Sequence, residues 1–459
     1  MSELYNLIPS QENIYTLVKY SFHKQIVQVP SSVSFDYDID FSLLLKALNI
    51  EIERNDCLRL RFKEVDGVIK EYFLPEYKIH RVPVLTFNTK EEQEKYFDKD
   101  AQTPVYFLKD ECYRIKFFRA YNGYSGIYFN VSHLVMDAMG IFIFYTDLMG
   151  VYKALATGSE LPPPMFRYED YIKSEHEKMK NTARLEKSAE FYKQYFAKGG
   201  EPGYAGIHGP EFLERERKRT HNPALKVPTA YSPIYDKSAF LILDIDAEKG
   251  QKILSFCREK SIAPEMLFIL AMRTYCSAVN YRTPDVFCNL MCGKRITYKD
   301  QRMGGCVAQT LQVRTIIPET DTFAEALDEC LTVRNQLFRN LNYPFTYSRG
   351  MLMKMYNHKV IQGVSAFMVS WLPFSSAANG SDLAMEFRTY NLGRYFNPLY
   401  AIVFPNPHTG GISINYMYRY KIVNEKTVRS FHKNTVDIIM KGIENPDITI
   451  RELLNGVTR

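Results

Sequence analysis

The stretch FNVSHLVMDAMGIFIFYTDL, from Phe129 to Leu148, decides how the first half of this chain folds. It starts inside an apolar run and reaches His133 and Asp137, which lie four residues apart. The pattern predicts a strand that ends at His133 and a helix that starts at Asp137. The helix is indicated by apolar residues at intervals of three and four, followed by a glycine stop signal: Ile141, Phe144, Tyr145, Leu148, Val151, Tyr152, Leu155 and then Gly158.

The residues upstream predict a hairpin and, before it, a helix and a strand. In YRIKFFRAYNGYSGIYFNV, residues 113–131, two apolar-rich runs flank Asn122-Gly123, a dipeptide typical of tight turns. FSLLLKALNIEIER, residues 41–54, has apolar residues at helical spacing. In LRLRF, residues 58–62, apolar residues alternate with arginines, as in a strand with one buried face. Arg59 is then expected on the opposite strand face, where a solvated charge is the simplest interpretation.

A second series of strands and helices follows a less regular region. Residues 160–233 contain LPPP, a charged helical run from 168 to 196, and the turn-rich KGGEPGYAGIHGPEF. We therefore predict a mixed α/β (α+β) chain with an N-terminal lobe at 1–178, a linker at 179–236 and a C-terminal lobe at 237–459. In the second lobe we expect strands at 239–245, 285–293 and 365–371, helices at 250–260, 264–279, 323–341 and 425–443, and a hairpin within 400–420.

Composition narrows the class of protein. Hydrophobic residues make up 46% and charged residues 24%, as in a globular protein. The net charge of +6 is spread along the chain, and its one basic run, ERERKRTH at 214–221, is expected to be a solvated loop. We therefore predict no nucleic-acid partner.

Cysteine usage and hydropathy predict the compartment. The eight cysteines form no CxxC pair, so they are expected to be reduced core residues, with no metal site. The N-terminus is polar and unlike a signal peptide, and no run approaches the ~20 apolar residues of a membrane helix. The predicted location is cytoplasmic, without a membrane partner.

Most motifs of enzyme chemistry are absent, which leaves His133 and Asp137 as the concentrated signal. The chain has no GxxxxGK[ST], GxGxxG, HExxH or GxSxG motif. Asp137 can be a helix N-cap and His133 a buried, hydrogen-bonded ring. Alternatively, the imidazole is a general base at a cleft and the aspartate fixes its loop through a buried ion pair. The two residues alone leave both interpretations open.

The order of segments along the whole chain resembles the condensation domains of nonribosomal peptide synthetases, members of the chloramphenicol acetyltransferase superfamily. LIPSQENIY is similar to the family's opening segment, and ALNIEIERNDCLRLRF to its helix followed by "RHxxLRTxF". SHLVMDA resembles the HHxxxDG motif, and RYEDYIKSEH a Tyr-x-Asp-aromatic segment. Farther on, DVFCNLMCGKR and GGCVAQTLQVR are similar to a strand with "GR" and to "GxFVNTLPLR", and NLNYPF to a "PFE" helix.

The resemblance implies two acetyltransferase-like lobes in a V-shaped pseudo-dimer, with a tunnel that reaches the histidine from both sides. His133 takes the place of the second motif histidine, and Asp137 that of the motif aspartate. In the family this aspartate forms a structural salt bridge with the arginine of the LRT segment, here Arg59. No tightly bound cofactor is implied, because phosphopantetheine or coenzyme A serves as the thioester donor.

Several positions depart from the family pattern. Ser132 stands for the first motif histidine, Ala138 for the motif glycine, and Gln309 for an asparagine. These residues are candidates for lining the substrate tunnel, as is Trp371, for which core packing is the alternative. The departures bear on substrate identity and leave room for a chain that has lost activity.

Three functions stay open at this point. The first is a condensation enzyme that takes an acyl group from a separate carrier protein and gives it to an amine or hydroxyl of a small-molecule acceptor. The second is a coenzyme A-dependent O- or N-acyltransferase. The third is a catalytically silent fold used as a docking module.

Overall fold

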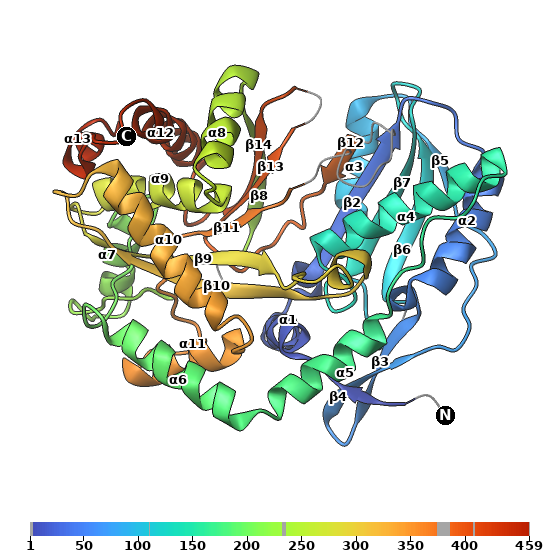
Figure 1. The fold of residues 1–459 in the computed structure, drawn as a ribbon, viewed down its shortest axis with the longest axis horizontal. Coiled ribbons are helices and arrows are strands. Elements are labelled where there is room, and N and C mark those ends of the chain that lie inside the picture. The colour runs from blue at the N-terminus through green and yellow to red at the C-terminus, as the bar shows by residue number, and fades with distance from the viewer. Residues whose placement is uncertain (1–2, 110, 232–235, 374–385, 407–408, 459) are drawn as a thin grey trace. The chain divides into compact units, whose positions relative to one another are not determined.

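The computed structural model describes residues 3–109, 111–231, 236–373, 386–406 and 409–458, which fall into two compact units. Unit 1 comprises Met1–Asn181, Gly293–Ala308 and Phe374–Arg394, and unit 2 comprises Thr182–Cys292, Gln309–Pro373 and Tyr395–Arg459 (Figure 1). The predicted mixed α/β class is confirmed, because each unit combines sheet and helix.

The described residues of unit 1 form two sheets. Its elements are β1 (Tyr5–Asn6), α1 (Pro9–Tyr20), β2 (Gln28–Phe35), α2 (Phe41–Arg54), β3 (Leu60–Val65), β4 (Val68–Phe73), β5 (Val84–Thr86), α3 (Lys90–Ala101), β6 (Tyr113–Arg119), β7 (Ser125–Ser132), α4 (Ala138–Thr157), α5 (Tyr168–Met179) and β12 (Glu386–Thr389). The larger sheet has the order β12-β2-β7-β6-β5, and the smaller one β1-β4-β3. The predicted hairpin is formed by β6 and β7, with Gly123 in the left-handed region at φ 83°.

The side chains of β7 alternate between two layers. Ile127, Phe129 and Val131 lie in the core cluster that contains the apolar face of α4. Tyr128 lies in a second cluster with Phe97 of α3. The strand that leads to His133 is thus buried on both faces, and α4 packs closely on α2.

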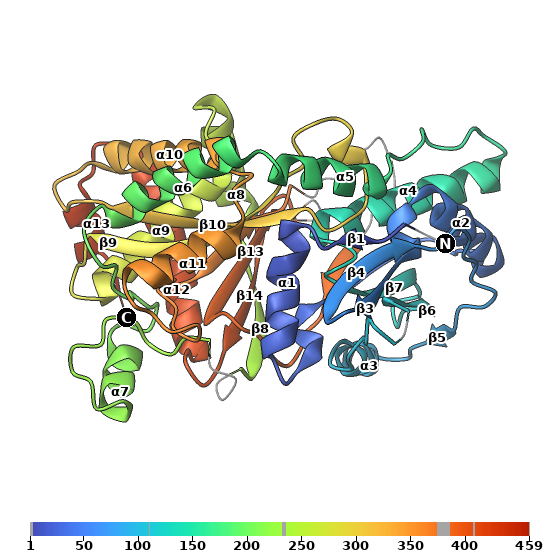
Figure 2. The ribbon, with the colours of Figure 1, turned by 90° about the horizontal axis from the view of Figure 1, so that it is seen from below.

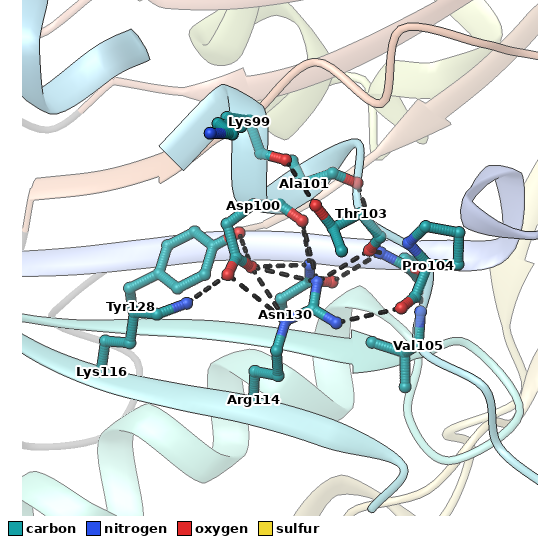
Figure 3. A network of polar contacts seen from close by, with 11 residues as sticks. Lys99, Asp100, Ala101, Thr103, Pro104, Val105, Arg114, Lys116, Tyr128 and Asn130 are labelled. Atoms are coloured by element: carbon teal, nitrogen blue, oxygen red, sulfur yellow. Dashed lines mark hydrogen bonds and ion pairs between the residues drawn. The ribbon is translucent and has the colours of Figure 1, made fainter. Parts of the chain in front are cut away.

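Asp100, near the end of α3, fastens this helix to the sheet (Figure 3). Its carboxylate accepts hydrogen bonds from Arg114, Lys116, Tyr128 and Asn130. Burial acts to raise the pKa of Asp100, but the bond from Lys116 and the charges of Arg114 and Lys116 outweigh it, so the pKa lies below its usual range. The carboxylate is therefore ionised in the folded chain at neutral pH.

Asp100→Asn is expected to lower the free energy of unfolding at pH 7 by about 2 kcal/mol, because two partly buried cations lose their counter-charge. A depressed folded-state pKa gives stability that is present above the unfolded value and lost as the pH falls through the folded value. The difference in the free energy of unfolding between wild type and Asp100→Asn should thus become smaller below about pH 4. Urea unfolding at pH 3.5 and 7 checks this, with the exposed Asp38→Asn as control; equal differences at both pH values would contradict it.

In the part of unit 2 that the structure describes, six strands form a sheet of order β10-β9-β11-β13-β14-β8. The elements of unit 2 are α6 (Thr182–Ala197), α7 (Glu211–Arg219), β8 (Ser238–Ile245), α8 (Ala247–Glu259), α9 (Pro264–Val279), β9 (Asp285–Gly293), β10 (Ala308–Ile316), α10 (Phe323–Arg339), α11 (Phe345–Met355), β11 (Met368–Trp371), β13 (Leu399–Pro405), β14 (Ile412–Arg419), α12 (Glu425–Glu444) and α13 (Ile450–Asn455). In Figure 2, β13, β14 and β8 run side by side, as their antiparallel pairing requires. Helix α9 is almost fully buried, against β11 and beneath α10, α12 and α13.

The structure divides the chain differently from the predicted lobes. The expected C-terminal lobe, 237–459, is interrupted, since Gly293–Ala308 and the described part of Phe374–Arg394 belong to unit 1. The physical reason is pairing: β12 is only four residues long, yet it extends the larger sheet of unit 1 beside β2. The expected linker, 179–236, belongs to unit 2 from Thr182 onward. The V arrangement of the lobes stays a prediction.

One local expectation is confirmed in part and another is wrong. The charged run 168–196 is helical as predicted, but it forms two helices, α5 and α6, which are separated at Lys180–Asn181. The basic run 214–221 lies mostly in helix α7 rather than in a loop. This helix has acidic residues in its first turn and basic residues in its last, which suits the helix dipole, and its buried side includes Phe212 and Leu213.

By length and composition, α4 could cross a membrane, contrary to the expectation that no segment could. Of the 18-residue stretch of α4 that is apolar enough to span a membrane, 56% is buried inside the fold, as in the core helix of a globular unit. The bent pair α8 and α9, at 117°, passes the same test only if the two are taken together.

Candidate active site

His133 follows the last residue of β7, where the ladder with β2 ends. Ser132 is paired with Gln28, and the backbone N–H of His133 donates to the carbonyl of Val27 over 2.8 Å. The chain then turns, with the N–H of Val135 donating to the carbonyl of Ser132 over 2.9 Å. The side chain of Ser132 is buried and accepts a hydrogen bond from the N–H of Leu134 over 3.4 Å. The strand end and this turn fix the backbone that carries the imidazole.

The environment of the ring favours a neutral imidazole. Burial lowers the pKa of His133, while the charge of Asp137 and a hydrogen bond to the histidine's own carbonyl raise it; the net pKa lies below its usual range. A carbonyl oxygen only accepts, so the ring nitrogen bonded to it carries a hydrogen. Nδ1 is the ring nitrogen nearer to the backbone, and a hydrogen on Nδ1 would leave the electron pair of Nε2 free. That nitrogen can act as a base.

Asp137 has two structural roles at once. It is the N-cap of α4, because its Oδ1 accepts the N–H of Gly140 over 2.7 Å, and its Oδ2 accepts the N–H of Val307 over 2.9 Å. It also forms a buried ion pair with Arg295, whose Nη2 lies 3.0 Å from Oδ1. Burial acts to raise the pKa of Asp137, but Arg295 and the backbone N–H groups outweigh it and hold the pKa below its usual range. The carboxylate is ionised and fully engaged.

The predicted pairing of Asp137 with Arg59 is wrong. Arg59 donates instead to the carbonyls of Ile52, Leu74 and Pro75, over 2.7 to 3.2 Å. The reason is local: Asp56–Arg59 forms a 3-10 turn and β3 begins only at Leu60, so Arg59 does not follow the alternation of the strand. Arg59 supports the active-site unit by joining the end of α2 to the segment after β4.

Arg295 was missed by the sequence reasoning, although the signal was there as an arginine two residues after the buried strand 285–293. Besides Asp137, its guanidinium donates to the carbonyls of Asp300, Met303 and Gly305. Through these hydrogen bonds, Arg295 holds the segment 293–308 close to Asp137. The approach is close: a Cβ on Gly140 would lie 2.9 Å from the carbonyl oxygen of Gly305, which explains a glycine in the first turn of α4.

Helix α5 holds the same segment from another side. The hydroxyl of Tyr168 donates to the carbonyl of Cys306 over 3.1 Å, and its ring fills the place that a side chain on Gly305 would need. Glu175 forms a buried ion pair with Lys294. The helix is itself fixed by Asp56, which accepts the N–H groups of Tyr168 and Glu169 over 2.9 and 3.1 Å. The segment is thus fastened at both of its ends.

This arrangement puts a thiol beside the histidine. The Sγ of Cys306 lies 3.7 Å from Nδ1 of His133, and the side chain of Cys306 is fully buried. Sequence spacing offers no signal for the contact, because the two residues are 173 positions apart. The site therefore consists of an imidazole, a thiol and a buried Asp–Arg pair, all in unit 1.

Sequence comparison identifies the family. The sequence model of the condensation domain family matches residues 1–455 of this chain. The chain belongs to the condensation domain family. This condensation domain is 22% identical over 466 residues to surfactin synthase subunit 1 of Bacillus subtilis (strain 168), with 98% of the chain and 12% of the relative covered. Surfactin synthase subunit 2 of the same organism is 21% identical over 346 residues, with 75% and 9% covered.

Solved structures agree in fold. The first condensation domain of the calcium-dependent antibiotic synthetase, in complex with a substrate analogue, matches with a TM-score of 0.79 at 15% identity over 98% of each chain. A mutant starter condensation domain of rhizomide synthetase, in complex with C8-CoA, matches with a TM-score of 0.79 at 15% identity over 98% of this chain and 96% of that one. The chain spans less than a fifth of the length of the two curated relatives. Family membership supports acyl or peptidyl transfer as the activity.

The remaining predicted site residues of the condensation domain lie in both units. Ala138 is the first residue of α4 and has no positive φ, so this position does not require the family's glycine. In unit 2, Gln309 donates from Nε2 to the carbonyl of Tyr343 over 2.8 Å, and Trp371 stacks on Phe268 with ring centroids 6.1 Å apart. Trp371 therefore packs against a core residue, which was the alternative to lining the tunnel. Roles for these residues in a tunnel stay predictions.

A buried acid lies next to the histidine turn. Gln11 donates from Nε2 to Glu71 over 2.6 Å and to the carbonyl of Leu134 over 3.0 Å, so it connects the acid to the residue after His133. Burial raises the pKa of Glu71 to about 8, against a lowering by the bond from Gln11. The carboxyl is therefore protonated in the folded condensation domain at neutral pH.

Glu71→Gln is expected to flatten one part of the pH dependence of stability. A raised folded-state pKa gives stability that is full below the unfolded value and is lost as the pH rises through the folded value. Wild type should thus lose stability relative to Glu71→Gln between pH 5 and pH 8, by on the order of 3 kcal/mol. Urea unfolding at pH 5, 6.5 and 8 measures this, with the exposed Glu64→Gln on β3 as control; parallel curves for wild type and Glu71→Gln would refute it.

Proposed function

We propose that this condensation domain transfers an acyl group from a pantetheine thioester to an amine or hydroxyl of a small-molecule acceptor, with His133 as general base. The observation that carries the proposal is the imidazole at the end of β7, whose Nδ1 lies 3.7 Å from the thiol of Cys306 and whose pKa burial holds below its usual range. The neighbouring carboxylate of Asp137 is paired with Arg295 and accepts two backbone N–H groups. Asp137 therefore holds the site together and leaves the proton transfer to the imidazole.

The reaction needs no covalent enzyme intermediate. The acceptor nitrogen or oxygen attacks the thioester carbonyl while Nε2 of His133 takes its proton. The tetrahedral intermediate then expels the pantetheine thiolate, which receives that proton from the imidazolium. General-base help of this kind contributes about 10² to 10⁴-fold, and holding both substrates in attack geometry supplies much of the rest.

The departures from the family motif are compatible with activity. The hydroxyl of Ser132 is used within the turn that carries His133, and Ala138 has no positive φ. Neither residue removes a group that the proposed proton transfer needs. This favours an active enzyme over a silent docking module.

Two kinds of donor, a carrier protein and coenzyme A, would present the acyl group as the same pantetheine thioester. The curated relatives are synthase subunits many times longer than this chain, which favours a donor held on a carrier protein or domain. Coenzyme A is the second candidate, because a starter condensation domain of the same fold was solved with C8-CoA. Coenzyme A ends in the same phosphopantetheine arm as a carrier protein, so the acyl-transfer step is common to both.

The test is thiol release from matched acyl-pantetheine, acyl-coenzyme A and acyl-carrier thioesters, each with pooled amines and alcohols. Acceptor-dependent release with the carrier thioester at a higher kcat/KM than with coenzyme A supports the first candidate, and the reverse order supports the second. Mass spectrometry of the product decides between amide and ester. Carrier binding without release from any donor would overturn the proposal in favour of a docking module.

A further inference from the structure

Cys306 is the side chain in contact with the histidine that neither the sequence pattern nor the proposed chemistry accounts for. Its sulfur lies 3.7 Å from Nδ1 of His133, the ring nitrogen away from the proposed reaction. The residue occupies a variable position in the family's "GxFVNTLPLR" segment, so the resemblance assigns it no role.

The backbone on both sides of Cys306 is fixed by the same residue that caps α4. The carbonyl of Gly305 accepts the N–H of Asp137 over 3.2 Å, and the N–H of Val307 donates to the Asp137 carboxylate over 2.9 Å. The carbonyl of Cys306 itself accepts the hydroxyl of Tyr168. With both neighbours and its own carbonyl bonded, the backbone that carries the thiol of Cys306 is fixed beside the ring.

The chemistry of the thiol suits a neutral contact. Burial raises the pKa of Cys306 far above its usual range, so the sulfur stays protonated and is a poor nucleophile. The backbone N–H of Ala308 donates toward this sulfur, which orients it. A thiol sulfur is a weak acceptor, and a hydrogen on Nδ1 would be a donor at a heavy-atom distance of 3.7 Å from this sulfur. The sulfur can therefore accept from Nδ1–H beside the histidine's own carbonyl.

We propose that Cys306 is a positioning residue that holds the His133 ring in the tautomer with its hydrogen on Nδ1, and so keeps Nε2 available as the base. The expected effect of Cys306 on the reaction rate rests on the proposed function. The contact between Cys306 and His133 does not, because it can be measured in the resting protein. Among the described residues, Asp137, which is paired with Arg295, acts on the pKa of the ring by its charge, and this thiol contacts Nδ1.

Two substitutions separate this role from simple packing. Cys306→Ala removes the acceptor, so the Nδ1–H population should fall and kcat should drop about tenfold, with KM changed by less than about twofold. Cys306→Ser introduces a stronger donor, which can give its hydrogen to Nδ1 and drive the ring to the Nε2–H form. The serine variant should therefore be no more active than the alanine variant.

The control is Cys112→Ala, which removes another fully buried sulfur of unit 1 whose own partner is the carbonyl of Phe107. The tautomer is read from the ring nitrogen shifts of ¹⁵N-histidine-labelled protein, with the His133 signals assigned from their loss in His133→Ala. The proposal is overturned if Cys306→Ala keeps the wild-type ring signals, or if its kcat equals that of Cys112→Ala. If no thioester turns over, the ring signals still decide the contact, so failure of the proposed function is recognised separately.

Discussion

Replacing His133 with alanine is expected to lower acceptor-dependent thiol release by about 10² to 10⁴-fold, because the acceptor loses the base that takes its proton. The ring of His133 is at the end of β7 rather than in the middle of a packed layer, so the fold should tolerate the change. The decisive quantity is kcat, measured with saturating donor and acceptor, since a loss of binding alone would appear in KM.

The matched control is His80→Ala, which removes an exposed histidine of the same unit and should leave kcat unchanged. Circular dichroism and the urea midpoint of His133→Ala should stay close to those of wild type. Equal kcat values for His133→Ala and His80→Ala in a folded protein would remove His133 from the mechanism and return the docking-module interpretation to first place.

Replacing Arg295 with methionine is expected to lower the free energy of unfolding by about 3 to 5 kcal/mol, because it leaves the Asp137 carboxylate buried without a counter-charge. The same change frees the carbonyls of the segment 293–308 that the guanidinium binds. Thiol release should fall as well, since this segment presents Cys306 to the histidine.

Arg59→Met is the natural comparison, because the family pattern assigned the ion pair to Arg59. A double-mutant cycle with Asp137→Asn should give a coupling free energy above about 1 kcal/mol for Arg295 and additivity within about 0.5 kcal/mol for Arg59. Urea unfolding of the four proteins in each cycle supplies the numbers. Stronger coupling of Asp137 to Arg59 than to Arg295 would reject the ion pair described here.

Features that depend on near neighbours in the chain were predictable. Helix α2 and strand β9 have the predicted bounds, and α9 starts at the proline that was predicted for its first turn. The positions of His133 at a strand end and of Asp137 at a helix start were also correct. Apolar periodicity, caps and turn residues act over about four residues, so the sequence contains them directly.

Features that depend on segments distant in the sequence could not be predicted. Asp137 meets Arg295 across 158 positions, and His133 meets Cys306 across 173. Strand alternation predicted Arg59 on the outer face of a strand. Arg59 lies instead in a 3-10 turn, and its guanidinium donates to backbone carbonyls. In the same way, β12 is too short to show a period, and its pairing with β2 assigns it to unit 1.

The sequence by itself therefore determined the type and order of most elements, the mixed α/β class, and the histidine and aspartate around which the site is built. Only the tertiary structure decided which arginine neutralises the aspartate, which thiol contacts the imidazole, and which segments of the second half join unit 1. The physical reason is that local periodicity specifies which face of an element is buried. It does not specify which distant segment covers that face, because that choice depends on packing and pairing throughout the unit.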